Sequence, residues 1–366
     1  MEKFRVKLND SVLVGSRAPT ALNVLIGLNT AGQYTGEIEK IEILNKSELP
    51  VSIITDLSIG TVGKGRELWR QVVNNSRFVA GTVPVYQAVN GRNTIDKTYL
   101  LELIKEQAEN GVKLITIHPT PNFDLMEMSK SRNVPITSRG GAAVCMDMIV
   151  GQKSENVYLQ ILDELIQLAV AHEVTLSIGS SFRSANIQDA MDKTYLFELS
   201  RQLEIANYCK ERNVNVIIET PGHAAPQDIF KICEKLDQNC PFPIMPLGPL
   251  PIDCAFEQDD LAGAMGAVLM GTRGCADILT VVTKEEHTGG IPTIDSIVSA
   301  VEKYSIAKHI IDVYKLNDVA ADNRVSIERS NRGSCIFGSD IECLRCGRLC
   351  PLRLAKSIKC DLFSEG

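Results

Sequence analysis

Short runs of β-branched and aliphatic residues recur along the chain, and each ends in a polar or glycine-rich turn followed by a helix-length segment. Runs this apolar predict strands covered on both faces, which indicates parallel pairing beneath helices. The intervening segments are amphipathic, as in Thr98 to Asn110 and Asn156 to His172. From residue 51 onward the runs are Val51 to Leu57, Phe78 to Val83, Lys113 to His118, Val134 to Ser138, Val174 to Gly179, Val214 to Glu219, Ile244 to Gly248 and Asp277 to Val282.

This alternation of strands and helices predicts an α/β fold, a (β/α)8 TIM-type barrel, with a doubly wound open sheet as the alternative. A further run near Leu25 raises the number of candidates to nine, so one of the nine is not a barrel strand. Ile38 to Leu44 is consistent with either a strand or a short helix. The predicted organisation is a short N-terminal segment over residues 1–50, a catalytic barrel over 51–325 and a C-terminal tail over 326–366.

Composition narrows the classes of partner. The chain has 366 residues, of which 44% are hydrophobic, and a net charge of −7, which argues against a nucleic-acid or anionic-membrane surface and leaves a small molecule as the expected partner. Most of the 11 cysteines stand singly in apolar segments, and the first residues contain no apolar signal region. We therefore expect a protein of the reducing cytoplasm. The apolar runs are too short to span a bilayer.

Polar residues cluster directly after the predicted strands. In a TIM-type barrel these positions surround the C-terminal mouth, where active sites are built from several strand ends. The sequence therefore predicts a site at this mouth. Its candidate residues are Asp56, Ser58, Tyr86, His118, Ser138, Arg139, Gly140, Ser180, Arg183, Glu219, His223, Lys284 and His287.

Two of these histidines, His223 and His287, lie on turns rich in glycine and proline, which would hold the imidazoles rigidly. Imidazoles on neighbouring strand ends could share a divalent metal, with water or substrate completing its coordination. Glu219 and Glu286 would then support the metal or bind substrate. The alternative is that both histidines only cap their loops.

The turn Ser138-Arg139-Gly140-Gly141 leads into a predicted helix. Backbone N–H groups at a helix start and an arginine side chain together suit a phosphate group. The simpler interpretation of Ser138 alone is an ordinary helix N-cap.

Three cysteines near the C-terminus, Cys343, Cys346 and Cys350, are separated by two and then three residues. Thiolates this close can reach one iron–sulfur cluster, and three ligands would leave one iron open to bind a small molecule. The alternative is a structural zinc knuckle with Cys335 or Cys360 as the fourth ligand.

In this order, several of these segments resemble the ThiC family of radical S-adenosylmethionine (SAM) enzymes, which includes phosphomethylpyrimidine synthase and 5-hydroxybenzimidazole synthase. The resemblance runs from about residue 51 to residue 350. The matching stretches are Asp56-Leu-Ser-Ile-Gly, Gly81-Thr-Val-Pro-Val-Tyr-Gln-Ala, Thr116-Ile-His, Ser138-Arg-Gly-Gly, Leu176-Ser-Ile-Gly, Ile187-Gln-Asp-Ala, Ile218-Glu-Thr-Pro-Gly-His, Leu247-Gly-Pro-Leu, Val282-Thr-Lys-Glu-Glu-His and the three terminal cysteines.

The resemblance implies a 4Fe-4S cluster on Cys343, Cys346 and Cys350, whose open iron binds SAM and yields a 5′-deoxyadenosyl radical. It also implies zinc or iron on His223 and His287, and a homodimer. The radical would rearrange 5-aminoimidazole ribotide. The residues that match ribotide-binding positions are Tyr86, His118, Ser138, Arg139, Gly140, Arg183 and Glu219.

The chain also departs from the family pattern. The second gap of the cysteine motif has three residues where the family usually has four. Ser180 stands where the family has a substrate-binding aspartate, Met245 replaces a tyrosine, Thr55 replaces a methionine, and a family asparagine falls near Leu25. The family region that precedes the barrel has little counterpart. These departures indicate a divergent member with a rewritten substrate pocket.

The leading hypothesis is therefore a radical SAM lyase that converts 5-aminoimidazole ribotide to the pyrimidine phosphate of thiamine. One alternative is the same chemistry giving 5-hydroxybenzimidazole for an anaerobic cobamide, and another is a different phosphorylated heterocycle as substrate. A non-catalytic paralogue with a structural metal knuckle is the alternative from a different class.

Overall fold

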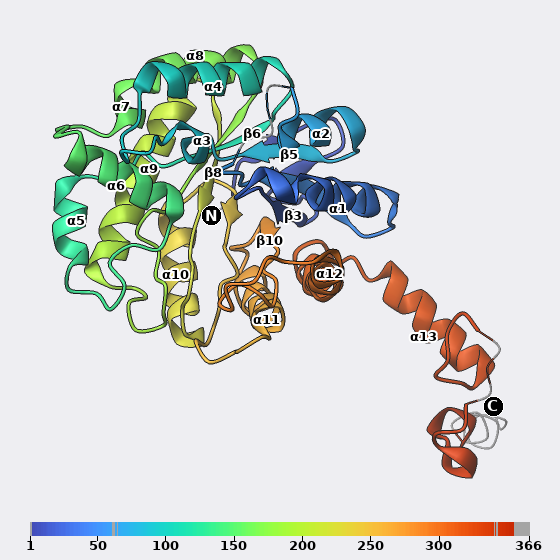
Figure 1. Ribbon diagram of the computed structural model, residues 1–366. Helices are drawn as coiled ribbons and strands as arrows, with labels where there is room; N and C mark the ends of the chain where they lie inside the picture. The colour runs from blue at the N-terminus through green and yellow to red at the C-terminus, as the bar shows by residue number, and fades with distance from the viewer. Residues whose placement is uncertain (1, 61–62, 64, 340, 342, 355–366) are drawn as a thin grey trace. The chain divides into compact units, whose positions relative to one another are not determined.

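A computed structural model describes residues 2–60, 63, 65–339, 341 and 343–354. They divide into two compact units, one ending at Leu316 and one beginning at Asn317, and each is described by itself. The first unit contains helices arranged around a parallel sheet (Figure 1). The helices are α1 (Tyr34–Lys46), α2 (Leu68–Asn75), α3 (Val85–Ala88), α4 (Lys97–Glu109), α5 (Phe123–Ser129), α6 (Arg139–Val150), α7 (Val157–Gln160), α8 (Leu162–Ala171), α9 (Lys193–Glu211), α10 (Pro226–Asn239), α11 (Asp259–Gly271) and α12 (Ile294–Leu316), with a 3₁₀ turn at Ala31–Gln33.

Eight strands pair side by side in the order β10-β3-β4-β5-β6-β7-β8-β9. The first and last strands of this order also meet, because the Asp277 N–H donates to the Ile244 carbonyl at 2.9 Å and Leu247 bridges Thr280. The sheet is therefore a closed parallel barrel, and the predicted (β/α)8 fold is confirmed. Its strands are β3 (Ala21–Ile26), β4 (Val51–Asp56), β5 (Val79–Thr82), β6 (Leu114–Ile117), β7 (Thr175–Ile178), β8 (Asn215–Glu219), β9 (Ile244–Met245) and β10 (Ile278–Thr280).

The candidate run that is not a strand is Val134 to Ser138, which forms the loop before α6. The run near Leu25 is instead the barrel strand β3. The sequence predicts barrel limits at residues 51 and 325, whereas the first barrel strand begins at Ala21 and the first unit ends at Leu316. The predicted helix from Asn156 to His172 is divided into α7 and α8 at Ile161.

The interior of the barrel is solid at one end. A short antiparallel hairpin, β1 (Arg5–Lys7) and β2 (Leu13–Gly15), contributes apolar side chains to the same cluster as the inward residues of the strands. Side chains from the strands and the hairpin thus fill the barrel interior at this end, as expected for a barrel whose core is packed. The cluster contains Val6, Leu8, Val14, Ala21, Ile53, Val79, Leu114, Ile217, Met245 and Ile278.

The second unit contains α13 (Ala320–Arg332) and a 3₁₀ turn at Gly347–Leu349. α13 ends at Gly333, whose positive φ of 61° is the left-handed conformation typical of a helix C-terminus. α13 has no buried residue. In the part of the chain that the structure describes, no helix combines the length and apolar character needed to cross a membrane.

Candidate active site

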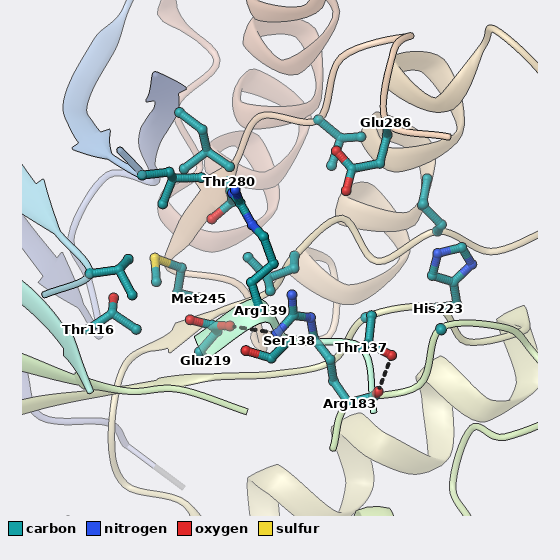
Figure 2. A pocket seen from close by; sticks show the side chains of 18 of the residues that line it. Thr116, Thr137, Ser138, Arg139, Arg183, Glu219, His223, Met245, Thr280 and Glu286 are labelled. Carbon is teal, nitrogen blue, oxygen red and sulfur yellow. Dashed lines mark hydrogen bonds and ion pairs between the residues drawn. The ribbon is translucent and has the colours of Figure 1, made fainter. Parts of the chain in front are cut away.

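A cavity of about 560 Å³ opens among the strand ends of the barrel. This volume suits one small organic molecule. Figure 2 shows that its side chains come from the strands on one side and from the following loops on the other. The cavity brings together nine of the residues predicted from sequence: Tyr86, His118, Ser138, Arg139, Arg183, Glu219, His223, Glu286 and His287.

The serine-arginine-glycine turn forms the start of α6. Ser138 is the N-cap, since its Oγ accepts the Gly141 N–H at 3.1 Å, and the same Oγ lies 2.8 Å from His118 Nε2. Gly140 lies against the face of this imidazole, because a Cβ there would approach three ring atoms within 2.3 to 2.8 Å. The N-cap interpretation of Ser138 is therefore confirmed, and the same hydroxyl also contacts a histidine of the cavity.

Two arginines carry the positive charge of the cavity. The Arg139 guanidinium lies 4.8 Å from the centre of the Tyr86 ring, within the range of a cation–π contact. Arg183 Nη1 donates to the Ser180 carbonyl at 2.9 Å and to Glu219 Oε1 at 3.3 Å (Figure 2). Two guanidinium groups beside the N-terminus of a helix form a site suited to a phosphate.

Burial shifts the protonation of the groups facing these arginines. It lowers the pKa of His118 to about 3, with the Arg183 charge adding to the effect, so this imidazole is neutral at physiological pH. Burial raises the pKa of Glu219 to about 6, against the opposing effect of Arg183. Glu219 can therefore gain or lose a proton near neutral pH, as a general acid or base requires.

The two predicted metal-binding histidines lie together, with ring centres 5.1 Å apart. Each Nδ1 is held by a carboxylate: His223 by Asp253 at 2.8 Å and His287 by Asp259 at 3.1 Å. A carboxylate on one ring nitrogen is the usual support of a metal-binding imidazole, leaving Nε2 for the metal. The pair therefore fits a divalent metal. Among the described residues no group of three or more histidine, cysteine or acidic side chains is gathered around one point.

Sequence reasoning missed Asp253 and Asp259 as the carboxylates beside the histidines, and favoured Glu219 and Glu286. Both aspartates follow β9, far from either histidine along the chain, so spacing gives no signal for them. Glu286 and Glu219 both line the cavity, and Glu219 is bonded to Arg183.

Glu198 of α9 was also missed, and it holds the loops after two strands. Its buried carboxylate accepts hydrogen bonds from the backbone N–H groups of Ser181 and Phe182 and from the hydroxyls of Ser180 and Thr120, at 2.6 to 2.8 Å. Ser180, which stands where the family has an aspartate, thus uses its hydroxyl to secure the loop that carries Arg183. No pattern in the sequence distinguishes this glutamate from those on the exposed faces of helices.

The three terminal cysteines belong to the second unit, where Cys343 is half-buried, Cys346 is exposed and Cys350 is buried. Three thiols within one short segment have the donor chemistry of an iron–sulfur cluster. The alternative fourth zinc ligand Cys335 is exposed, and Cys360 lies outside the described residues.

A model of the family described as "Radical SAM ThiC family" matches residues 2–335. The chain belongs to this family. Radical SAM chemistry uses an iron–sulfur cluster and SAM, so membership implies both cofactors. The match includes the whole barrel and stops before Cys343.

Relatives agree with this membership. The chain is 34% identical to the phosphomethylpyrimidine synthase of Pyrobaculum aerophilum over 87% of its own length and 75% of the relative. It is 30% identical to the phosphomethylpyrimidine synthase of Fusobacterium nucleatum over 94% of its length and 85% of the relative. An enzyme of the same name from Alkaliphilus oremlandii is 32% identical over 82% of this chain and 69% of the relative.

Proposed function

We propose that this ThiC-family protein is a radical SAM lyase that rearranges 5-aminoimidazole ribotide to the pyrimidine phosphate of thiamine. The observation that carries the proposal is the combination of two arginines, a helix N-terminus and a titratable glutamate in one cavity of about 560 Å³. Relatives at 30% to 34% identity bear the name phosphomethylpyrimidine synthase, which supports the same reaction.

The ribotide phosphate binds at the start of α6, where Arg139 and Arg183 supply charge-assisted hydrogen bonds. Glu219 bonds Arg183 at 3.3 Å, so a bound phosphate and this carboxylate share one guanidinium. Neutral His118 presents its imidazole to the ligand without adding charge. These residues fix the position of the ribotide, and the walls of the cavity limit the access of water to it.

Cys343, Cys346 and Cys350 would hold the 4Fe-4S cluster, which together with SAM supplies the radical that starts the reaction. Around the ribotide, Glu219 is the group that can accept or return a proton near neutral pH. His223 and His287 would hold zinc or iron through Nε2, and such an ion would act as a Lewis acid on a substrate oxygen or nitrogen. Asp253 and Asp259 keep the two rings oriented for that role.

The test is anaerobic reconstitution with iron and sulfide, followed by dithionite and SAM with and without 5-aminoimidazole ribotide. We expect 5′-deoxyadenosine that depends on the ribotide, together with the pyrimidine phosphate. Cys346→Ala should lose the absorbance of the cluster and the deoxyadenosine. The exposed Cys254→Ala is the matched control and should keep both, because this cysteine lies in the loop before α11.

Different outcomes separate the alternatives. Formation of deoxyadenosine together with 5-hydroxybenzimidazole would support the radical chemistry and contradict the proposed product. If the reconstituted protein shows no cluster absorbance and forms no deoxyadenosine, the proposed enzymatic function is contradicted and a structural metal knuckle is favoured.

The histidine pair has its own test, which does not depend on turnover. His223→Ala should lower the zinc or iron bound per chain after dialysis, because one imidazole ligand is removed. His172→Ala is the control, since His172 ends α8 and does not line the cavity. Equal metal content in all three proteins would exclude this pair as the binding site.

A further inference from the structure

The base of the cavity is lined by side chains that belong to the barrel strands themselves. They come from β3, β4, β6, β9 and β10, and each of them is at least nine-tenths buried. All five are uncharged, and Glu219 of β8, which lines the same cavity, is paired in register with one of them, Met245. The five residues are Asn23, Thr55, Thr116, Met245 and Thr280.

Asn23 is oriented by its neighbours. Thr55 Oγ1 donates to Asn23 Oδ1 at 2.8 Å, which directs the amide nitrogen away from Thr55. That nitrogen faces the sulfur of Met245 at 3.8 Å. A thioether is a weak acceptor, so the N–H groups of Asn23 keep most of their capacity to bind a stronger one.

Thr280 lies beside Asn23, because the two residues are paired in register on adjacent parallel strands. Its side chain is 1% exposed and lines the cavity. Among the described residues its Oγ1 has no hydrogen-bond partner. A buried hydroxyl without a partner costs free energy, and such a group in a cavity points to a ligand that would satisfy it.

We propose that Asn23 and Thr280 form a specificity-determining contact for the heterocycle of the substrate. The amide N–H of Asn23 and the hydroxyl of Thr280 converge on one hydrogen-bond acceptor, a ring nitrogen or carbonyl oxygen. Leu25 and Leu57 also line the cavity, and their apolar surfaces suit the faces of a planar ring. The preferred ligand has an anionic phosphate at one end and an uncharged, acceptor-bearing heterocycle at the other.

This inference rests on the proposed function, because it assigns the two ends of the ribotide to the two ends of the cavity. Thr55, Asn23 and Met245 form one hydrogen-bonded group at the base, and this group determines which ring is accepted.

The test is calorimetric titration of the full-length protein with ribose 5-phosphate, 5-aminoimidazole ribotide and inosine 5′-phosphate. The affinity for ribose 5-phosphate reports binding at the phosphate end alone. The additional affinity of a nucleotide, compared with ribose 5-phosphate, reports recognition of the ring. Thr280→Val keeps the shape of the side chain and removes the hydroxyl. We expect it to reduce that gain about threefold to tenfold, the value of one neutral hydrogen bond, and to leave ribose 5-phosphate binding unchanged.

Thr175→Val is the matched control. Thr175 is a buried threonine on the barrel strand β7, its hydroxyl also lacks a partner among the described residues, and it does not line the cavity. It should bind all three ligands like the unaltered protein. Circular dichroism of both variants verifies that they are folded.

The possible outcomes separate the two proposals. If the ribotide gains affinity over ribose 5-phosphate and Thr280→Val does not reduce the gain, the inference is wrong and the proposed substrate stands. If only inosine 5′-phosphate gains affinity and loses it in Thr280→Val, the inference stands and the proposed substrate is wrong. If neither nucleotide exceeds ribose 5-phosphate, the base does not recognise a ring and the inference is overturned.

Discussion

The two ends of the barrel both contain buried polar groups, and the groups compared here are satisfied to different degrees. We call the end that the hairpin side chains fill the closed end. There the Asp277 carboxylate accepts hydrogen bonds from Lys3 at 2.9 Å, from Lys315 at 2.7 Å and from the Ile244 N–H at 2.9 Å. At the mouth, His118 Nδ1, Thr280 Oγ1 and Asp259 Oδ2 are buried without partners among the described residues.

The difference indicates what each end does. A buried charge with a complete set of partners fixes a structure and has no capacity left for a ligand. Buried groups with unused hydrogen-bonding capacity cost stability, and those that line the cavity, such as His118 and Thr280, can be satisfied by a ligand. We therefore expect substitutions at the closed end to change stability, and substitutions at the mouth to change binding more than stability.

The largest effect is expected for Asp277→Asn. Removing the charge leaves two buried lysine ammonium groups without their counter-ion, which should lower the free energy of unfolding by about 3 to 5 kcal/mol. Urea denaturation measures this loss. Ribose 5-phosphate affinity of the folded protein should stay within about twofold of the original. A large loss of affinity with little loss of stability would reverse the assignment of the two ends.

Gly140→Ala should disturb the mouth itself. The added Cβ would meet the His118 ring at 2.3 to 2.8 Å, so the start of α6 must shift, at a cost of about 1 to 3 kcal/mol. We expect ribose 5-phosphate binding to fall at least tenfold by calorimetry, because the phosphate site moves with the helix.

Gly36→Ala provides the control for that substitution. Gly36 lies in α1 and a Cβ there meets nothing within 4 Å. This change should raise stability by about 0.5 to 1 kcal/mol through helix propensity and leave binding unaltered. Normal binding in Gly140→Ala would show that His118 and α6 are not closely packed.

The last expected effect is the pH dependence that Glu219 contributes. Its pKa is raised by burial from 4.5 to about 6, so the folded state favours the protonated carboxyl. Stability from this group is therefore highest below pH 4.5 and is lost as the pH rises through 6, by roughly 2 kcal/mol in total. Glu219→Gln should remove that part of the pH profile. Parallel profiles for both proteins would show that the pKa of Glu219 does not change on folding.

The fold was readable from the chain because strand-length apolar runs alternate with amphipathic segments, and local periodicity reports burial directly. The exception, Val134 to Ser138, contains Pro135 and two hydroxyl residues and forms the loop before α6. Its residues Val134 and Ile136 line the cavity, so their apolar character serves the site and not the sheet.

The sequence by itself determined the barrel, the positions of polar residues after its strands and the membership of a family through its motifs. Only the tertiary structure decided which groups meet: Asp253 with His223, Glu198 with the loop of Ser180, and Asn23 with Thr280. The physical reason is the separation along the chain of the residues that interact. Strand and helix patterns arise from residues a few positions apart, whereas these contacts join residues brought together only when strands, helices and loops pack against one another.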